Sequence, residues 1–120
     1  MRLNEVSFGD GIPVDGYGPG FWRVGGDRIE GAALVSPAGA ASWGGWDDLA
    51  ALTGLAEKID LVFLGTGAEI AYPPASVRDA LQAAGIAYEV MASPAAARTY
   101  NVLLAEGRRV AVALMPLVAG

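Results

Sequence analysis

A glycine-rich turn, Gly65-Thr66-Gly67, is one of two short segments whose residue types and spacing suit chemistry. It follows the apolar run at residues 61–64, which we predict to be a buried strand, and ligands of open α/β sheets bind beyond the carboxyl ends of such strands. A phosphate loop needs a longer glycine pattern with a lysine, and a dinucleotide fingerprint needs a third glycine inside the following helix. Because Glu69 and two prolines follow here instead, we favour a tight turn packed against a helix, with a ligand site as the alternative.

The second segment, Arg98-Thr99-Tyr100-Asn101, lies inside a predicted helix that has Glu106 near its end. Threonine and asparagine are poor residues for the middle of a helix, so their presence calls for a reason. One hypothesis is an anion pocket, in which Arg98 and the positive helix N-terminus face the same crevice as the glycine turn. The other, which we favour, is a polar network that fixes the helix to the sheet, with Arg98 buried and paired by Glu106 or another carboxylate. The candidate pocket or polar cluster consists of Gly65, Thr66, Gly67, Ser93, Arg98, Thr99, Asn101 and Glu106.

Aromatic residues suggest a different kind of site, a protein interface. The three tryptophans, Trp22, Trp43 and Trp46, all lie in the first half of the chain. Tryptophan is enriched at interfaces, and a Trp-Gly-Gly-Trp segment can present two rings on a pliable backbone. We predict that Trp22 packs in the core, whereas Trp43 and Trp46 fit an interface and internal packing equally well.

The composition removes much of the catalytic repertoire. Histidine and cysteine are both absent, which excludes the usual zinc, iron and copper ligands, thiolate nucleophiles and histidine general bases. A carboxylate site for a hard cation stays open, although helix capping and solvation explain the pair Asp47-Asp48. A net charge of −5 with eight lysines and arginines argues against nucleic acid, whose phosphates need clustered cations. We therefore predict no metal, no cofactor and no catalytic residue, and we favour a non-enzymatic role.

Length and the two chain ends bear on domain organisation and location. A chain of 120 residues that is 53% hydrophobic has the usual size of one domain, so we expect a single domain over residues 1–120. The N-terminus carries no secretory or transit signal, and the apolar stretch at residues 110–120 is about half as long as a membrane-spanning helix. We expect a cytoplasmic protein without a transmembrane segment.

Hydrophobic periodicity and turn residues predict the elements of the first half. Residues 1–20 contain several glycine turns, and we predict mostly loop there. Two β-prone runs at residues 21–24 and 29–35 flank Gly25-Gly26 and indicate a hairpin, whose second strand has both faces covered at its far end. We then predict a helix that starts with Asp47 as its N-cap and has a weak point at Gly54.

Strands and helices alternate in the second half. The predicted elements, in order, are a strand at 61–64, a helix from Pro73-Pro74 to Gly85, a strand at 86–91, a helix from Ser93-Pro94 to Gly107 and a strand at 110–115. The Ser93 hydroxyl is expected to cap its helix. This order favours right-handed crossovers and helices that cover the sheet, so we predict a three-layer α/β fold with a mixed, largely parallel central sheet. Predicted core residues are Leu61, Phe63, Leu103, Ala111 and Leu114.

Residues 89–114, EVMASPAAARTYNVLLAEGRRVAVAL, together with the glycine turn before them, closely resemble one known family. It is the small α/β domain of unknown function that includes the mitochondrial complex I assembly factor three and related bacterial and archaeal proteins. The resemblance covers nearly the whole chain, because Tyr17, the hairpin at 21–35 and Trp43 also match. The family motif falls on Gly65, Thr66, Gly67, Met91, Arg98, Thr99, Tyr100, Asn101, Glu106, Arg108 and Ala111.

The resemblance implies a three-layer fold around a mixed sheet and, in mitochondria, a role in assembling the respiratory NADH:quinone oxidoreductase through contacts with other proteins. It implies no reaction and assigns no role to individual residues. The chain departs from the family pattern at Ser93, where threonine is common, and at Ala97, where cysteine is frequent, so a thiol-dependent role is not general. We expect a bacterial member, because no mitochondrial presequence precedes the domain.

Two functions follow as hypotheses. The first is a protein-interaction or assembly factor whose partners are respiratory complex subunits or other assembly factors, acting from the cytoplasmic side. The alternative is binding of a small anion, or an uncharacterised enzymatic activity, in a pocket at Gly65-Thr66-Gly67 and Arg98. A third hypothesis, oligomerisation, rests only on the tryptophan content and the acidity of the chain.

Overall fold

A five-stranded mixed sheet forms the centre of the fold, in a computed structural model that describes residues 11–117. Its strands are β4 (Ala33–Ser36), β5 (Gly39–Ser42), β6 (Leu61–Gly65), β7 (Ala87–Met91) and β8 (Val110–Leu114). The spatial order is β5-β4-β8-β6-β7. β6 pairs in parallel with β8 and β7, whereas β4 pairs antiparallel with both β8 and β5. The mixed sheet is confirmed, and parallel pairing is limited to the three strands of the second half.

Two helices connect the parallel strands, as the β-α-β-α-β order predicts. They are α2 (Ala75–Ala83) between β6 and β7, and α3 (Ser93–Ala105) between β7 and β8. Gly85 and Gly107 follow these helices with positive φ angles of 74° and 83°, a conformation that L side chains disfavour and that ends a helix. Both predicted glycine stops are therefore confirmed.

The helix predicted after residue 47 is shorter than its apolar spacing indicates. A 3-10 turn, η1 (Gly45–Asp47), precedes α1 (Leu49–Thr53). Asp47 lies inside the 3-10 turn and is not an N-cap, and Asp48 takes the N-cap position without a side-chain capping bond. The helix ends before Gly54, the predicted weak point, yet the later apolar residues are still buried. Their spacing therefore indicates which residues face the core and does not indicate a continuous helix.

A second, three-stranded antiparallel sheet contains β1 (Val14–Gly18), β2 (Phe21–Val24) and β3 (Asp27–Glu30). The hairpin predicted around Gly25-Gly26 is confirmed, and both glycines have positive φ. The expected loop is wrong for β1, whose residues are extended because they pair with β2. The strand predicted at 29–35 is divided at Gly31, where φ is +76°, so that β3 and β4 belong to different sheets.

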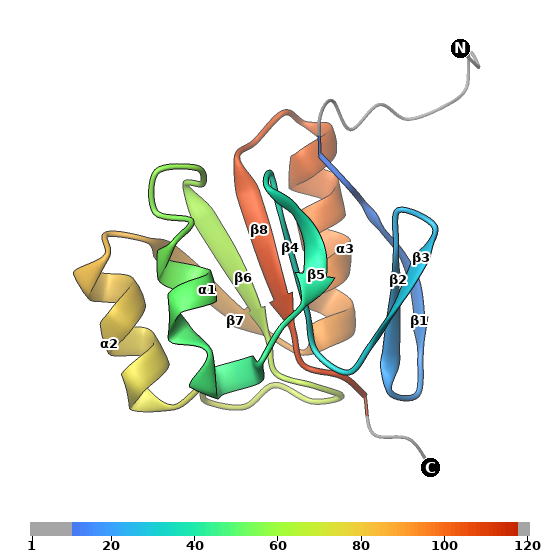
Figure 1. The fold of residues 1–120 in the computed structure, drawn as a ribbon, viewed down its shortest axis with the longest axis horizontal. Coiled ribbons are helices and arrows are strands. Elements are labelled where there is room, and N and C mark those ends of the chain that lie inside the picture. The colour runs from blue at the N-terminus through green and yellow to red at the C-terminus, as the bar shows by residue number, and fades with distance from the viewer. Residues whose placement is uncertain (1–10, 118–120) are drawn as a thin grey trace.

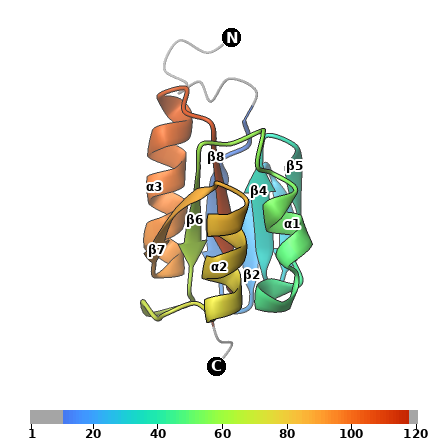
Figure 2. The same cartoon turned by 90° about the vertical axis from the view of Figure 1, so that its left-hand side faces the viewer.

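The elements form layers on both faces of the five-stranded sheet. Figure 1 shows the three-stranded sheet beside α3, on the side away from α1 and α2, and Figure 2 shows α3 on one side of the five-stranded sheet with α1 and α2 on the other. Alternate residues of β4 serve the two layers: Ala33 and Val35 pack toward α3, and Leu34 packs toward α1 and α2. The strand is thus covered on both faces, as predicted.

Most of the predicted core is buried. Phe63, Ala111 and Leu114 are fully buried, whereas Leu61 and Leu103 are only partly buried at the edge of the cluster beneath α3. Trp22 is also fully buried, as expected. Within residues 11–117 no helix has the length and apolar character needed to cross a membrane.

Candidate functional site

The ends of β6, β7 and β8 meet the start of α3 around one buried hydroxyl, that of Ser93. The hydroxyl accepts a hydrogen bond from the Gly67 N–H at 2.8 Å and donates one to the Met115 carbonyl at 2.7 Å. The Ser93 N–H donates to the Gly67 carbonyl at 2.7 Å. The structure therefore brings Gly67 and Ser93 together, as the sequence analysis expected, and their donors are bonded within the protein.

Gly65 is required by this close packing. A Cβ atom at this position would lie 2.8 Å from the Ser93 Oγ and 2.9 Å from the Ser93 Cα. The Gly65 carbonyl accepts a hydrogen bond from the Met115 N–H at 3.0 Å, which ties β6 to the end of β8. The glycine thus allows the helix to approach the strand end, and the space beside it is filled by protein.

Thr66 organises the loop that follows β6. Its hydroxyl accepts a hydrogen bond from the Ala71 N–H at 3.0 Å and donates to the Glu69 carbonyl at 2.8 Å, with the Met91 carbonyl as a second acceptor at 3.2 Å. The Thr66 N–H donates to the Met91 carbonyl at 2.9 Å. This side chain is engaged in local structure, which favours the tight-turn interpretation of the glycine segment.

The predicted capping role of Ser93 is wrong. Ala92 occupies the N-cap position of α3, and Ser93 is the first residue of the helix with Pro94 beside it. A residue at the N-cap would bond the exposed N–H groups of its own helix. The Ser93 hydroxyl instead joins the loop at Gly67 to the end of β8, so its role is tertiary.

Asn101 and Tyr100 fix α3 to the beginning of the three-stranded sheet. The Asn101 side chain accepts from the Val14 N–H at 2.9 Å and donates to the Val14 carbonyl at 2.8 Å. The buried Tyr100 hydroxyl donates to the Ile12 carbonyl at 2.8 Å. Burial raises the pKa of the Tyr100 phenol. A mid-helix asparagine is thus explained by two hydrogen bonds to backbone far away in the sequence.

Arg98 does not have the environment that the sequence analysis assumed. Both Arg98 and Glu106 are exposed, and Thr99 is half-buried, so a buried ion pair between the two charged residues is absent. Arg98 lies five residues into α3, about 7.5 Å along the helix axis from Ser93. The cluster predicted from the sequence therefore separates into a buried turn at the strand ends, a backbone clamp at Asn101 and exposed charges on the helix.

The two remaining tryptophans pack on each other. Trp43 is only 5% exposed, and its Nε1 donates to the Asp48 carbonyl at 3.2 Å. Trp46 is half-buried and meets Trp43 edge to face, with ring centroids 5.3 Å apart. The ring of Trp43 is enclosed in the cluster beneath α1 and α2, which favours internal packing over an interface for this residue.

Among residues 11–117, histidine, cysteine and carboxylate side chains form no group of three that could hold a metal ion. The polar side chains around the glycine turn donate to and accept from the protein itself. Such an arrangement holds strand ends and a helix in place. We call the group formed by Gly65, Gly67, Ser93 and Met115 the structural lock.

One surface feature was missed by the sequence analysis. A groove of about 330 Å³ is lined by Ile70, Ala71, Tyr72 and Val90. Ile70 and Tyr72 are 67% and 91% exposed. Exposed large apolar side chains that lie together are typical of surfaces that bind other molecules. The available signal was the segment Ile70-Ala71-Tyr72, which places two large apolar residues in a loop before Pro73-Pro74.

The fold and the lock define a small α/β protein with a mixed sheet, helices on both faces and an added antiparallel sheet. The chain belongs to the family described as protein of unknown function (DUF498/DUF598), whose model matches residues 14–115. It is 47% identical over 117 residues to an uncharacterised protein of Rhodobacter capsulatus, with 98% of this chain and 94% of that protein covered.

Animal relatives carry a functional name. The chain is 34% identical to the Danio rerio NADH dehydrogenase (ubiquinone) 1 alpha subcomplex assembly factor 3, with 92% of this chain and 67% of that protein covered. The human protein of the same name is 32% identical, with 89% of this chain and 62% of that protein covered. This chain thus spans about two thirds of the length of these assembly factors.

Solved structures share the fold. A Bartonella henselae protein described as an outer membrane protein superposes with a TM-score of 0.81 at 30% identity, covering 88% of this chain and 95% of that chain. A Bordetella pertussis protein described as an Mth938-like domain superposes with a TM-score of 0.74 at 32% identity, covering 97% of this chain and 92% of that chain. The predicted family resemblance and fold class are both confirmed.

Proposed function

We propose that this protein is a non-enzymatic assembly factor that binds other proteins, and that its partners are subunits or assembly factors of the respiratory NADH:quinone oxidoreductase. The observation that carries the proposal is the 34% identity, over 92% of the chain, to an NADH dehydrogenase assembly factor. We further propose that residues 1–120 fold as one domain and that the protein acts in the cytoplasm.

The geometry of the described residues supports an interaction role over the alternative anion pocket. The Gly67 N–H and the Ser93 hydroxyl and N–H are already bonded inside the protein, so an anion would have to displace these bonds. Arg98 is exposed and lies well along α3 from its N-terminus. Exposed apolar residues at Ile70 and Tyr72 offer a surface of the type that binds proteins.

The test removes the gene from cells that produce the protein and measures the amount of assembled NADH:quinone oxidoreductase in their membranes by native gel electrophoresis. We expect less assembled enzyme, with recovery when the wild-type gene is returned. An unchanged amount in the deletion strain would refute the assignment to this complex. Purification of the tagged protein should recover subunits of the same complex, and recovery of none would count equally against it.

A further inference from the structure

The outer side of β7 is a free sheet edge. β7 is the last strand in the order β5-β4-β8-β6-β7, so its far side has no partner strand among residues 11–117. In a parallel ladder a residue directs its N–H and its carbonyl to the same neighbouring strand, and successive residues alternate. The Met91 carbonyl accepts from Thr66 at the end of β6. Tyr88 and Val90 therefore direct their peptide groups outward.

The exposed apolar residues lie beside this edge. Val90 of β7 lines the groove together with Ile70, Ala71 and Tyr72 of the loop between β6 and α2. Figure 2 looks toward the β7 side, and this loop, coloured yellow-green, runs along the bottom of the molecule. Tyr88 and Val90 pack toward α1 and α2, so the apolar groove and these two side chains occupy the same face of the sheet.

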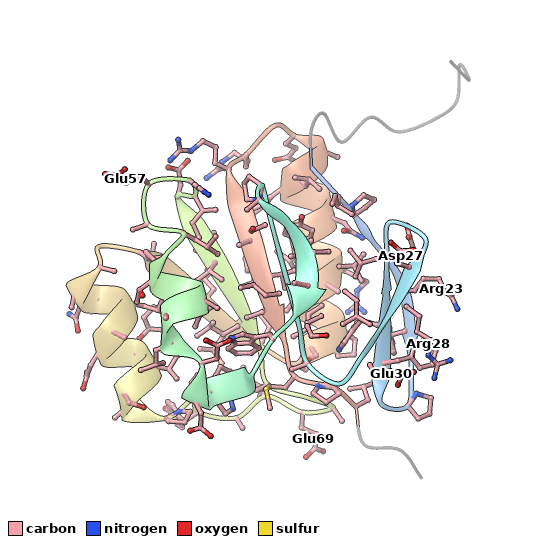
Figure 3. All side chains as sticks on the ribbon, viewed as in Figure 1. Arg23, Asp27, Arg28, Glu30, Glu57 and Glu69 are labelled. Carbon is pink, nitrogen blue, oxygen red and sulfur yellow. The ribbon has the colours of Figure 1, made fainter. Side chains whose placement is uncertain are left out.

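The opposite face of the edge carries one carboxylate, that of Glu89. Glu89 lies between Tyr88 and Val90, is exposed, and points to the other face because side chains alternate along a strand. Residues 66–75 and 85–93 contain Glu69 and Glu89 and neither lysine nor arginine. Glu69 lies at the end of the molecule opposite Glu57 in Figure 3. A strand added here would meet an apolar groove on one face and a carboxylate on the other.

We propose that β7 accepts an extended segment of a partner protein, in which apolar residues alternate with lysine or arginine, as an additional strand of the sheet. Main-chain hydrogen bonds to Tyr88 and Val90 would supply affinity, and the alternating side chains would supply specificity. The apolar residues enter the groove at Ile70 and Tyr72, and the basic residues lie beside Glu89. This inference rests on the proposed function and identifies the binding surface and the chemistry of the partner segment.

Charge argues against a second copy of this chain as the occupant. A two-fold antiparallel pairing that bonds the outward groups of Tyr88 to those of Val90 places Glu89 directly opposite the same residue of the other copy. Like charges at directly opposite positions destabilise a pair of strands. A basic segment instead places a favourable charge pair at this position.

The experiment uses a short peptide in which valine and lysine alternate, with a valine and glutamate peptide as its control. Binding to the whole chain is followed by NMR, together with hydrogen exchange of the amide groups. We expect the lysine peptide to bind, to shift the resonances of Tyr72 and Val90, and to slow exchange of the outward amides of Tyr88 and Val90. N-methylation of one alternate set of peptide amides should abolish binding, and N-methylation of the other set should not.

Variants in the exposed loop test the groove without disturbing the core. We expect Tyr72→Ser to weaken binding of the lysine peptide by about tenfold, whereas Val102→Ser, at another exposed apolar residue on α3, should leave binding unchanged. Glu89→Lys should reverse the preference between the two peptides, and Glu57→Lys, in the segment between α1 and β6, should not.

The possible results separate this inference from the proposed function. Equal affinity for both peptides, binding without protection of Tyr88 and Val90, or no binding at all would overturn the docking inference. Concentration-dependent dimers that protect the same amides would also overturn it in favour of self-association. None of these results bears on the gene deletion, which tests the assembly role alone.

Discussion

At the residue scale, the hydroxyl of Ser93 is a hydrogen-bond partner for two backbone groups. It accepts from the Gly67 N–H and donates to the Met115 carbonyl, and Ser93 itself is fully buried. Buried polar groups that lose a partner retain their full desolvation penalty. Loss of the Ser93 hydroxyl therefore removes two of the hydrogen bonds that hold the strand ends to α3.

Replacing Ser93 by alanine should lower the free energy of unfolding by about 2 to 3 kcal/mol, because two buried backbone groups lose their partner. Urea denaturation measures the change. Ser76→Ala, at an exposed serine of α2, is the matched control and should change stability by less than about 0.5 kcal/mol. Equal midpoints for Ser93→Ala and wild type would disprove the lock.

Because Arg98 is exposed, its truncation should not cause the large loss of stability that breaking a buried ion pair would cause. A paired, buried arginine would cost about 3 kcal/mol on truncation, but Arg98 is exposed. We expect Arg98→Ala to change the free energy of unfolding by less than about 0.5 kcal/mol. Thermal melts with and without phosphate provide the measurement. A phosphate-induced stabilisation of wild type that the variant lacks would revive the anion site.

The phenol of Tyr100 makes the free energy of unfolding depend on pH in the alkaline range. Burial raises its pKa in the folded state above the ordinary value of 10.0, so the folded state holds this proton more tightly than the unfolded state. The resulting stability is complete below about pH 10, and it is lost progressively as the pH rises above that value toward the raised pKa of the folded state.

Tyr100→Phe should lose about 1 kcal/mol near neutral pH with its hydrogen bond to Ile12. Because phenylalanine has no proton to lose, the variant should lose less further stability between about pH 8 and pH 11 than wild type does. Urea midpoints across this range test the prediction. Parallel pH profiles for the two proteins would contradict it.

At the element scale, β6 lies between two strands and contributes to the apolar clusters on both faces of the sheet. It pairs with β7 and β8, and its residues alternate between the two apolar clusters, with Phe63 toward α3 and Val62 and Leu64 toward α1 and α2. Short apolar runs of this kind are typical of strands that are buried on both faces. The stability of the sheet should therefore respond strongly to changes in β6.

Phe63→Ala should lower the free energy of unfolding by about 3 kcal/mol through lost burial and the cavity that remains. Tyr72→Ala removes an aromatic ring that is 91% exposed and should have little effect on stability. Both changes are read from denaturant midpoints. Similar losses in the two variants would show that burial of Phe63 is not the cause.

At the scale of the whole molecule, the three-stranded sheet is held to the α/β part by a few identifiable contacts. Trp22 and Val24 of β2 pack in the same cluster as Ala96, Tyr100 and other residues of α3. Asn101 bonds both backbone groups of Val14 at the start of β1. Loss of the two Asn101 hydrogen bonds should therefore loosen the three-stranded sheet more than the five-stranded sheet.

Asn101→Ala should increase hydrogen exchange in β1 and β2 while exchange in β6 and β8 stays close to that of wild type, because local opening is governed by the contacts that hold each unit. Exchange followed by mass spectrometry measures the difference. Val102→Ala, at the neighbouring exposed position, is the control. A uniform increase over the whole chain would mean that the two sheets unfold together.

The sequence by itself determined the local structure of the second half and the chemistry that is missing. The strands at Leu61 and Val110, the glycine stops at Gly85 and Gly107, and the hairpin at Gly25-Gly26 depend on apolar runs and on backbone conformations that few residues adopt. The absence of histidine and cysteine is likewise a property of composition. These signals are local, so they can be interpreted without knowledge of the fold.

Only the tertiary structure decided which polar groups meet. β1 is a strand because β2 pairs with it, and the Ser93 hydroxyl bonds Gly67 and Met115 instead of its own helix. The Asn101 amide reaches Val14, which is 87 positions away in the sequence, and Arg98 points away from any core. Such pairings depend on distances created by packing the layers together, and residue types and spacing along one chain do not contain those distances.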